Sequence, residues 1–289
     1  MTHPTLPPAP PPSDVVAQFD AFHAARARTD LVGRLYAAAM GEGYPHEIAA
    51  SSSCDWPLLG LLAGRLRMRP GQLLVDAGCG TGGIGLWLAR ALAVRLEGFD
   101  LSPVAVAQAA TRRTHFAVPA AFRVAGLDDT GLPDGCAHGA VCVDALSLAA
   151  DRDGALRELG RILAPGARLT LTRSLRHGAE PAWETQARAA GLTVEHVDER
   201  PTEPAMWARL YRLWISNADD LRRELGDIPA GRMLVEAHRM LPVLSGRRAV
   251  LLTLRRPAAQ PAAHVTADRM TVPGRHLHDG PAPSERNLQ

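Results

Sequence analysis

The chain of 289 residues contains no lysine, and its basic side chains are all arginines apart from histidine. These arginines are scattered among acidic residues, so that 32 basic and 30 acidic side chains leave a formal net charge of +2. No block of like charge and no repeated basic–aromatic pattern is present, although contacts to a phosphate backbone depend on clustered cations. We therefore expect no nucleic-acid partner.

Cysteine is also scarce, and its four positions, Cys54, Cys79, Cys136 and Cys142, form no Cys-x-x-Cys pair. Structural zinc sites need closely spaced cysteine and histidine ligands, and disulfide scaffolds are typical of short, cysteine-dense chains. The sequence thus predicts buried free thiols, and no carboxylate cluster or cysteine motif indicates a metal site.

No apolar run approaches the roughly 20 residues that a membrane helix needs, and the N-terminus "MTHPTLPPAPPPSD" has no signal-peptide pattern. We expect a soluble, cytoplasmic protein without a membrane partner. Residues 1–13 are proline-rich, and residues 258–289 are rich in proline, alanine and polar residues without periodicity, so both ends are predicted to be disordered.

Between these ends, short apolar runs alternate with helical patterns from residue 72 onwards. The pattern predicts strands over 72–78, 95–100, 120–126, 139–146, 167–174, 193–200 and 247–256, with helices over 83–92, 102–115, 153–163 and 180–191 between them. Such alternation is typical of a doubly wound α/β fold, whose mostly parallel sheet is covered on both faces and binds ligands at the carboxyl ends of its strands.

Two segments depart from this alternation. Residues 14–68 read as an N-terminal helical cap, with helices over 14–40 and near 57–68, before the α/β domain of residues 69–257. Residues 204–242 read as an insert of two helices, near 204–225 and 230–241, between the last two strands. We expect this insert to act as a lid over the sheet.

The stretch "VDAGCGTGGIG" concentrates five glycines between a strand and a helix, which is the geometry of a nucleotide site. Gly78, Gly80 and Gly83 satisfy the dinucleotide pattern G-x-G-x-x-G. The same loop also fits D-x-G-x-G-x-G, in which Asp76 would repel a pyrophosphate but suit a cationic amino-acid group. Asp100 lies about 20 residues on, where a carboxylate can accept hydrogen bonds from ribose hydroxyls.

Five motifs in order resemble those of the class I S-adenosylmethionine-dependent methyltransferases, over about residues 73–171. They are "VDAGCGTG", "GFDLSPVAVAQA", "LDDTGLPDG", "VDALSLAADR" and "RELGRILAPGARLTL". The resemblance implies a Rossmann-like sheet of seven strands, six parallel and the last antiparallel, with S-adenosylmethionine as cofactor and S-adenosylhomocysteine as product. The cofactor-binding residues that it implies are Asp76, Gly78, Cys79, Gly80, Gly82, Asp100, Leu101, Leu127, Asp128 and Asp144.

The acceptor side of the site has no fixed motif. His46, Asp144 and His177 are the candidates for a general base, each weighed against an ordinary structural role. Tyr44, Trp207, Tyr211 and Trp214 are the candidate pocket residues, the last three because their spacing of four and three places them on one helical face. A plain packing role is the alternative for that face.

These features predict the methylation, on oxygen, nitrogen or carbon, of a small and largely apolar metabolite, by a monomer or homodimer. The arginine, alanine and proline bias fits a bacterial source and natural-product tailoring. One alternative is a relative that binds the cofactor and catalyses a cyclisation or rearrangement without methyl transfer. An NAD-dependent dehydrogenase is less favoured, because the Tyr-x-x-x-Lys motif is impossible without lysine.

Overall fold

The computed structural model of the protein describes residues 12–258. The expectations for the two disordered ends concern residues 1–11 and 259–289 almost entirely, and those residues lie outside the described part.

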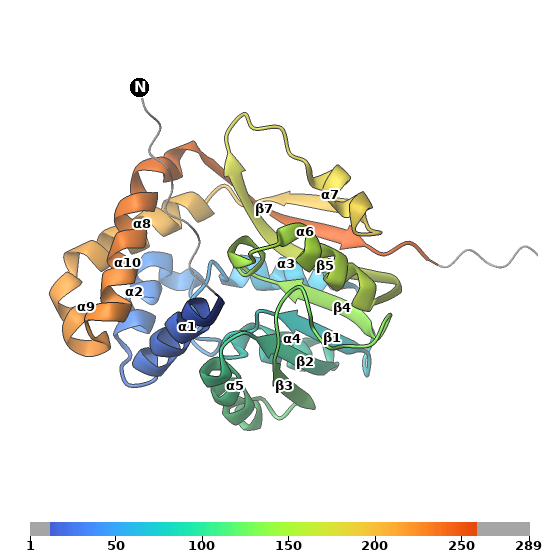
Figure 1. Cartoon of the computed structure of the whole chain (residues 1–289), viewed down its shortest axis with the longest axis horizontal. Helices are drawn as coiled ribbons and strands as arrows, with labels where there is room; N and C mark the ends of the chain where they lie inside the picture. Colours follow the sequence, from blue (N-terminus) through green and yellow to red (C-terminus); the bar gives the residue numbers. More distant parts are fainter. Residues whose placement is uncertain (1–11, 259–289) are drawn as a thin grey trace, which may run out of the picture. The chain divides into compact units, whose positions relative to one another are not determined.

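Seven strands form a single sheet in the order β3-β2-β1-β4-β5-β7-β6 (Figure 1). Neighbouring strands from β3 to β5 run parallel, while β7 pairs antiparallel with both β5 and β6. Six strands thus share one direction and only β7 opposes them, which confirms the predicted sheet. The strands are β1 (Leu73–Ala77), β2 (Arg95–Asp100), β3 (Ala120–Val124), β4 (Ala137–Cys142), β5 (Leu163–Arg176), β6 (Thr193–Glu199) and β7 (Arg247–Arg255).

Helices cover both faces of this sheet because its central strands are buried on both sides. One face packs against α3 (Trp56–Leu66), α4 (Gly83–Leu92) and α5 (Pro103–Phe116), and the other against α6 (Arg152–Ile162) and α7 (Trp183–Ala189). Asp55 and Ser102 begin α3 and α5, since each side chain accepts a hydrogen bond from a backbone N–H of the first turn and a proline follows.

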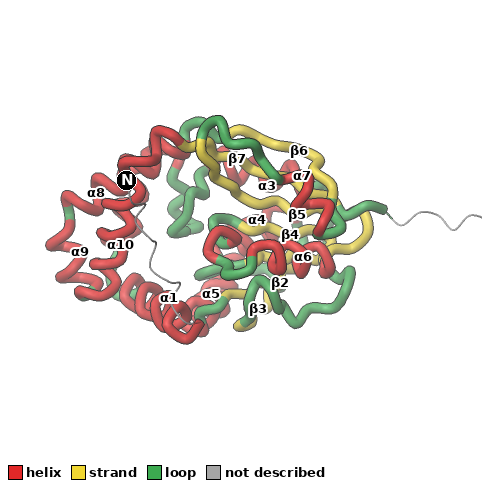
Figure 2. Tube along the Cα trace, turned by 45° about the horizontal axis from the view of Figure 1, so that its top comes forward, coloured by secondary structure: helices red, strands yellow, loops and turns green. Residues whose placement is uncertain are grey.

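A second group of helices gathers beside the sheet and shares a hydrophobic core of its own (Figure 2). It comprises α1 (Pro12–Arg26), α2 (Leu31–Met40), α8 (Glu203–Ser216), α9 (Ala218–Leu225) and α10 (Asp227–Met240). The N-terminal segment and the insert between β6 and β7, far apart in the chain, therefore build one structure. We call this group of five helices the cap.

The single helix predicted over 14–40 is wrong, because the chain breaks between Arg26 and Leu31. The hydroxyl of Thr29 donates to Glu224 of α9 and accepts the backbone N–H of Leu31 at 3.1 Å. A tertiary contact that the local pattern does not contain thus starts a new helix.

The two-helix reading of the insert is also wrong, since it holds three helices. The first predicted helix ends at Asn217, whose side-chain amide donates to the carbonyl of Leu213 at 2.8 Å. This bond competes with continuation of the helix, and the chain turns into α9.

Candidate active site

The glycine loop lies at the carboxyl end of β1, where it leads into α4. The backbone N–H groups of Gly78 and Cys79 both donate to the carbonyl of Phe99 at 2.9 Å, which draws the loop towards β2. Gly78 has φ +72°, and a Cβ there would lie 2.4 Å from the Cβ of Ala145. Only glycine fits this crossing between the ends of β1 and β4.

Asp76 lies beneath the loop and does not line a cavity. Its carboxylate is 3% exposed and accepts the backbone N–H of Gly85, in the first turn of α4, at 3.0 Å. Burial raises the pKa of Asp76 to about 7, against the lowering effect of the Gly85 hydrogen bond. Gly82, another residue of the expected set, also lies outside the lining, and a Cβ there would meet Ala109 at 2.9 Å.

A cleft of about 430 Å³ opens above the loop and contains the other eight expected cofactor residues. Asp100 ends β2, and its two carboxylate oxygens accept the backbone N–H groups of Gly80 at 2.8 Å and Ser102 at 2.9 Å. Each carboxylate oxygen has more than one lone pair, so Asp100 can still accept hydrogen bonds from ribose hydroxyls in the cleft. The other expected residues in the lining are Gly78, Cys79, Gly80, Leu101, Leu127, Asp128 and Asp144.

Asp144 reaches the cleft from the end of β4 with φ +57°, and its carboxylate is already held. It accepts the backbone N–H of Ser53 at 2.6 Å, the Ser53 hydroxyl at 3.1 Å and the Thr172 hydroxyl at 2.9 Å. These bonds tie the loop before α3 to the ends of β4 and β5. This is the structural role that the sequence left as an alternative to catalysis.

Helix α1 lines the cleft as part of the helical cap expected over residues 14–68, but the sequence reasoning named none of the α1 residues as candidates. His23 lines the cleft at 9% exposure, and its Nδ1 has no hydrogen-bond partner among the described residues. Burial lowers the pKa of His23, although Asp100 and Asp20 act to raise it. Ser51, in the same lining, likewise has a buried hydroxyl that finds no partner in the described part of the chain. The signal available was the apolar helical stripe of Phe19 and Phe22, on which His23 continues.

The cleft therefore offers what S-adenosylmethionine requires. Two buried polar atoms, on His23 and Ser51, have no hydrogen-bond partner among the described residues, and a bound ligand can supply one to each. Its carboxylates Asp100, Asp128 and Asp144 outnumber the single arginine, Arg26, in the lining. An acidic cleft suits a ligand that carries a sulfonium and an ammonium group and disfavours the pyrophosphate of a dinucleotide.

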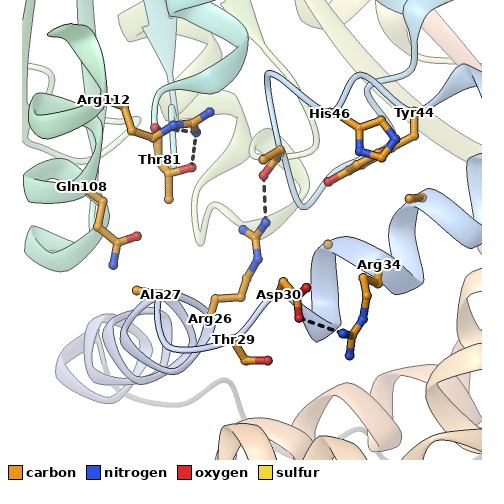
Figure 3. A pocket seen from close by; sticks show the side chains of 13 residues that line it. Arg26, Ala27, Thr29, Asp30, Arg34, Tyr44, His46, Thr81, Gln108 and Arg112 are labelled. Carbon is orange, nitrogen blue, oxygen red and sulfur yellow. Dashed lines mark hydrogen bonds and ion pairs between the residues drawn. The ribbon is translucent and has the colours of Figure 1, made fainter. Parts of the chain in front are cut away.

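A second cavity of about 490 Å³ adjoins the cleft, and Arg26 and Thr81 line both (Figure 3). We call it the arginine chamber. Tyr44 and His46 line this chamber, not the cleft, and their rings meet edge to face at 4.9 Å. His46 is exposed, so this candidate base lies apart from the residues that would hold the cofactor.

The remaining candidates line neither cavity. His177 lies on an exposed turn after β5. Trp207, Tyr211 and Trp214 do share one face of α8, but this face packs on Tyr36 of α2 within the core of the cap. The Tyr211 hydroxyl donates to Glu236 of α10 at 2.8 Å. The aromatic stripe therefore joins α8 to its neighbours in the cap.

Comparison with known proteins agrees with this arrangement. Residues 74–166 match the family model described as a methyltransferase domain, which extends from β1 into the start of β5. The match assigns residues 74–166 to a methyltransferase domain, and the fold and the glycine loop are those of the class I S-adenosylmethionine-dependent methyltransferases, whose cofactor is S-adenosylmethionine.

Among curated proteins, the chain is 30% identical over 165 residues to 27-O-demethylrifamycin SV methyltransferase of Amycolatopsis mediterranei, covering 56% of this chain and 58% of that one. It is 26% identical over 167 residues to the O-methyltransferase resE of Aspergillus sclerotiorum, covering 56% and 61%. The matches thus span less than two thirds of these relatives. Among solved structures, the [4+2]-cyclase SpnF superposes with a TM-score of 0.68 at 22% identity, covering 87% of this chain and 98% of that one.

Within the described residues, no helix has the length and apolarity to cross a membrane, and no group of three or more potential ligand side chains is placed to hold a metal ion.

Proposed function

We propose that this protein transfers the methyl group of S-adenosylmethionine to an oxygen atom of a small, largely apolar metabolite, as a tailoring step in natural-product synthesis. The observation that carries the proposal is the acidic cleft above the glycine loop, with Asp100 at the ribose position and unpartnered polar atoms on His23 and Ser51.

The choice of oxygen rests on the relatives. Two of the curated proteins that match are named as an O-methyltransferase and as a methyltransferase of a 27-O-demethyl compound. The apolar character of the acceptor rests on the cleft itself, whose lining includes Val15, Phe19, Phe22 and Leu148 beside the polar groups.

Methyl transfer is an in-line displacement that needs the acceptor oxygen aligned behind the methyl group, at about 3 Å. In this chain the alignment would come from the cap, because α1 lies over the cleft and α2 packs with the insert. When bound, the cofactor supplies the methyl group and a neutral leaving group. We therefore propose that residues 14–68 line the acceptor side and that the insert of residues 204–242, which lines neither cavity, supports them by packing on α2.

Asp144 is the only one of the three candidate bases that lines the cleft. Asp144→Asn separates its two roles, since the amide keeps the shape but cannot take a proton. A base would show a loss of kcat of at least about a hundredfold. A purely structural residue would show a lower melting temperature with kcat retained.

The deciding experiment supplies S-adenosylmethionine with a deuterated methyl group, together with a panel of phenols, enols and macrolide-type alcohols. Mass spectrometry then follows transfer of the heavy methyl group, with Asp100→Ala as a matched control for the loss of the cofactor site. A labelled methyl ether supports the proposal, and fragmentation identifies the acceptor atom. An unlabelled isomer of a panel compound, formed only when cofactor is bound, would contradict transfer and support a rearrangement.

A further inference from the structure

The arginine chamber lies beside the cofactor cleft, and apart from Thr81 and Gln108 its lining residues are outside the five methyltransferase-like motifs. The ionisable side chains in its lining are Arg26, Arg34, Arg112, Tyr44, His46 and Asp30. Asp30 pairs with Arg34 at 3.1 Å. Since no further acid faces the chamber, Arg26 and Arg112 have no carboxylate partner within it.

These two arginines differ in how their guanidinium groups are used. Arg112 donates from both terminal nitrogens to Thr81, Glu47 and Ile48 at distances of 2.7–3.1 Å, so its hydrogen-bonding capacity is largely spent on backbone carbonyls. Arg26 donates once, from Nη2 to the carbonyl of Ala49 at 2.8 Å. A guanidinium carries five N–H donors, so most of those on Arg26 have no protein acceptor in the described part of the chain.

The surroundings of Arg26 make this costly for a charge. Burial lowers the pKa of Arg26. The Phe22 ring, whose centroid lies 5.9 Å from the guanidinium carbon, favours the charge through a cation–π contact but offers no hydrogen-bond acceptor in the ring plane. Burial and the charge of Arg26 also lower the pKa of Arg112. Two like charges are therefore held near one another with few counter-charges, an arrangement that a bound anion would stabilise.

The chamber also offers neutral groups suited to an anion. The Thr81 hydroxyl and the Arg26 guanidinium line one space between α1, α5 and the loop that carries Tyr44 (Figure 3). Gln108 lines it too, and its amide nitrogen also donates to the carbonyl of His23 at 3.1 Å. Planar guanidinium groups bind carboxylates and phosphates through paired hydrogen bonds. The volume of about 490 Å³ falls in the range of small-molecule sites.

We propose that the arginine chamber is an anion-binding site in which Arg26 holds a carboxylate or phosphate group of a molecule bound in the adjoining cleft. This chemistry has two sources, an acid group on the acceptor and the carboxylate on the methionine portion of the cofactor. The acceptor is the source that we expect, because the chamber is far larger than one carboxylate needs. That assignment rests on the proposed function and adds an acid group to the largely apolar acceptor.

The test compares wild-type protein with Arg26→Met. Arg28→Met is the matched control, because Arg28 lies just beyond the same helix, is exposed, and donates only to the nearby carbonyl of Ala24. Calorimetry measures the affinity for S-adenosylhomocysteine and for 5′-methylthioadenosine, which lacks the amino-acid end. Inorganic phosphate is then titrated into the protein loaded with S-adenosylhomocysteine, at an ionic strength held constant with chloride, while the melting temperature is followed.

If the acceptor supplies the anion, phosphate stabilises the wild type and Arg28→Met but not Arg26→Met, and the affinity for S-adenosylhomocysteine stays within about twofold. If the cofactor supplies it, Arg26→Met weakens S-adenosylhomocysteine by about tenfold or more and leaves 5′-methylthioadenosine unchanged. Arg26→Lys keeps the positive charge. This variant should therefore retain part of the response that Arg26→Met loses, either stabilisation by phosphate or affinity for S-adenosylhomocysteine. A variant Arg26→Met that matches the wild type in both measurements overturns the proposal.

These readouts are equilibrium measurements and need no turnover. A wild type that binds S-adenosylhomocysteine and phosphate but labels no acceptor would refute the methyltransferase proposal and leave the anion site standing.

Discussion

The cofactor cleft and the arginine chamber share Arg26 and Thr81 yet are built in opposite ways. The cleft takes its carboxylates from loops that follow successive strands, at positions fixed by the sheet. The chamber takes its arginines from α1, α2 and α5, which meet only through tertiary packing. This difference supports the proposal that the strand ends bind the cofactor and that the helices around them select the acceptor.

The largest expected effect is a difference in stability between variants of two arginines of the chamber, Arg112 and Arg26. Arg112→Met should lower the free energy of unfolding by about 3 kcal/mol, because it leaves the carbonyls of Glu47 and Ile48 without their donor. Denaturant unfolding measures this, with Arg113→Met, an exposed neighbour on α5, as the control. Arg26→Met should cost much less stability, and an equal loss in both variants would remove the distinction between a structural and a ligand-binding arginine.

On the cleft side, Asp100→Ala should weaken binding of S-adenosylhomocysteine by about thirtyfold, or about 2 kcal/mol. The variant loses the ribose acceptors and also frees the N–H of Gly80. Calorimetry gives the affinity, and Asp129→Ala, an exposed acid outside the lining, is the control. An unchanged affinity in Asp100→Ala would contradict the assignment of Asp100 to the ribose hydroxyls.

The loop before α3 separates the cavities, since Ser51 and Ser52 line the cleft and Ala49 lines the chamber. Thr172→Val should destabilise the protein by about 1.5 kcal/mol, because its hydroxyl both donates to Asp144 and accepts from it. Thr253→Val is the matched control. Its buried hydroxyl has no partner in residues 12–258, so the melting temperature should stay level or rise. An equal loss of stability in Thr172→Val and Thr253→Val would show that the hydrogen bonds between Thr172 and Asp144 do not stabilise the protein.

The last expected effect concerns Asp76 and pH. Its folded pKa of about 7 lies above its ordinary 3.8, so folded protein keeps a proton that unfolded protein has lost. The retained proton contributes to the free energy of unfolding; this contribution is fully present below pH 3.8 and is lost as the pH rises towards 7. Asp76→Asn should therefore gain stability relative to wild type as the pH rises from 5 to 8, by about 2 to 3 kcal/mol, because each pH unit below the folded pKa is worth about 1.4 kcal/mol. Thermal unfolding at both pH values measures it, and a pH-independent gap would show that Asp76 is ionised throughout.

Much of the cofactor side was readable from the sequence because its determinants are local. Asp100 follows its own strand, and the glycine loop follows β1, so parallel pairing alone brings them together. Asp76 shows the limit of that reading. The pattern of acid and glycines was recognised, but only the structure shows that the carboxylate bonds to α4 beneath the loop.

The sequence by itself determined the sheet, its direction and the position of the cofactor loop, since strand periodicity and turn glycines act over a few residues. Only the tertiary structure decided where α1 lies, and with it that His23 Nδ1 has no hydrogen-bond partner among the described residues and that Arg26 has a single one, the carbonyl of Ala49. It also placed Trp207 and Trp214 in the core of the cap, not in a pocket. The sequence shows that a helical face is apolar, but it does not show which partner buries that face. The partner depends on packing between segments nearly two hundred residues apart, such as those that carry Thr29 and Glu224.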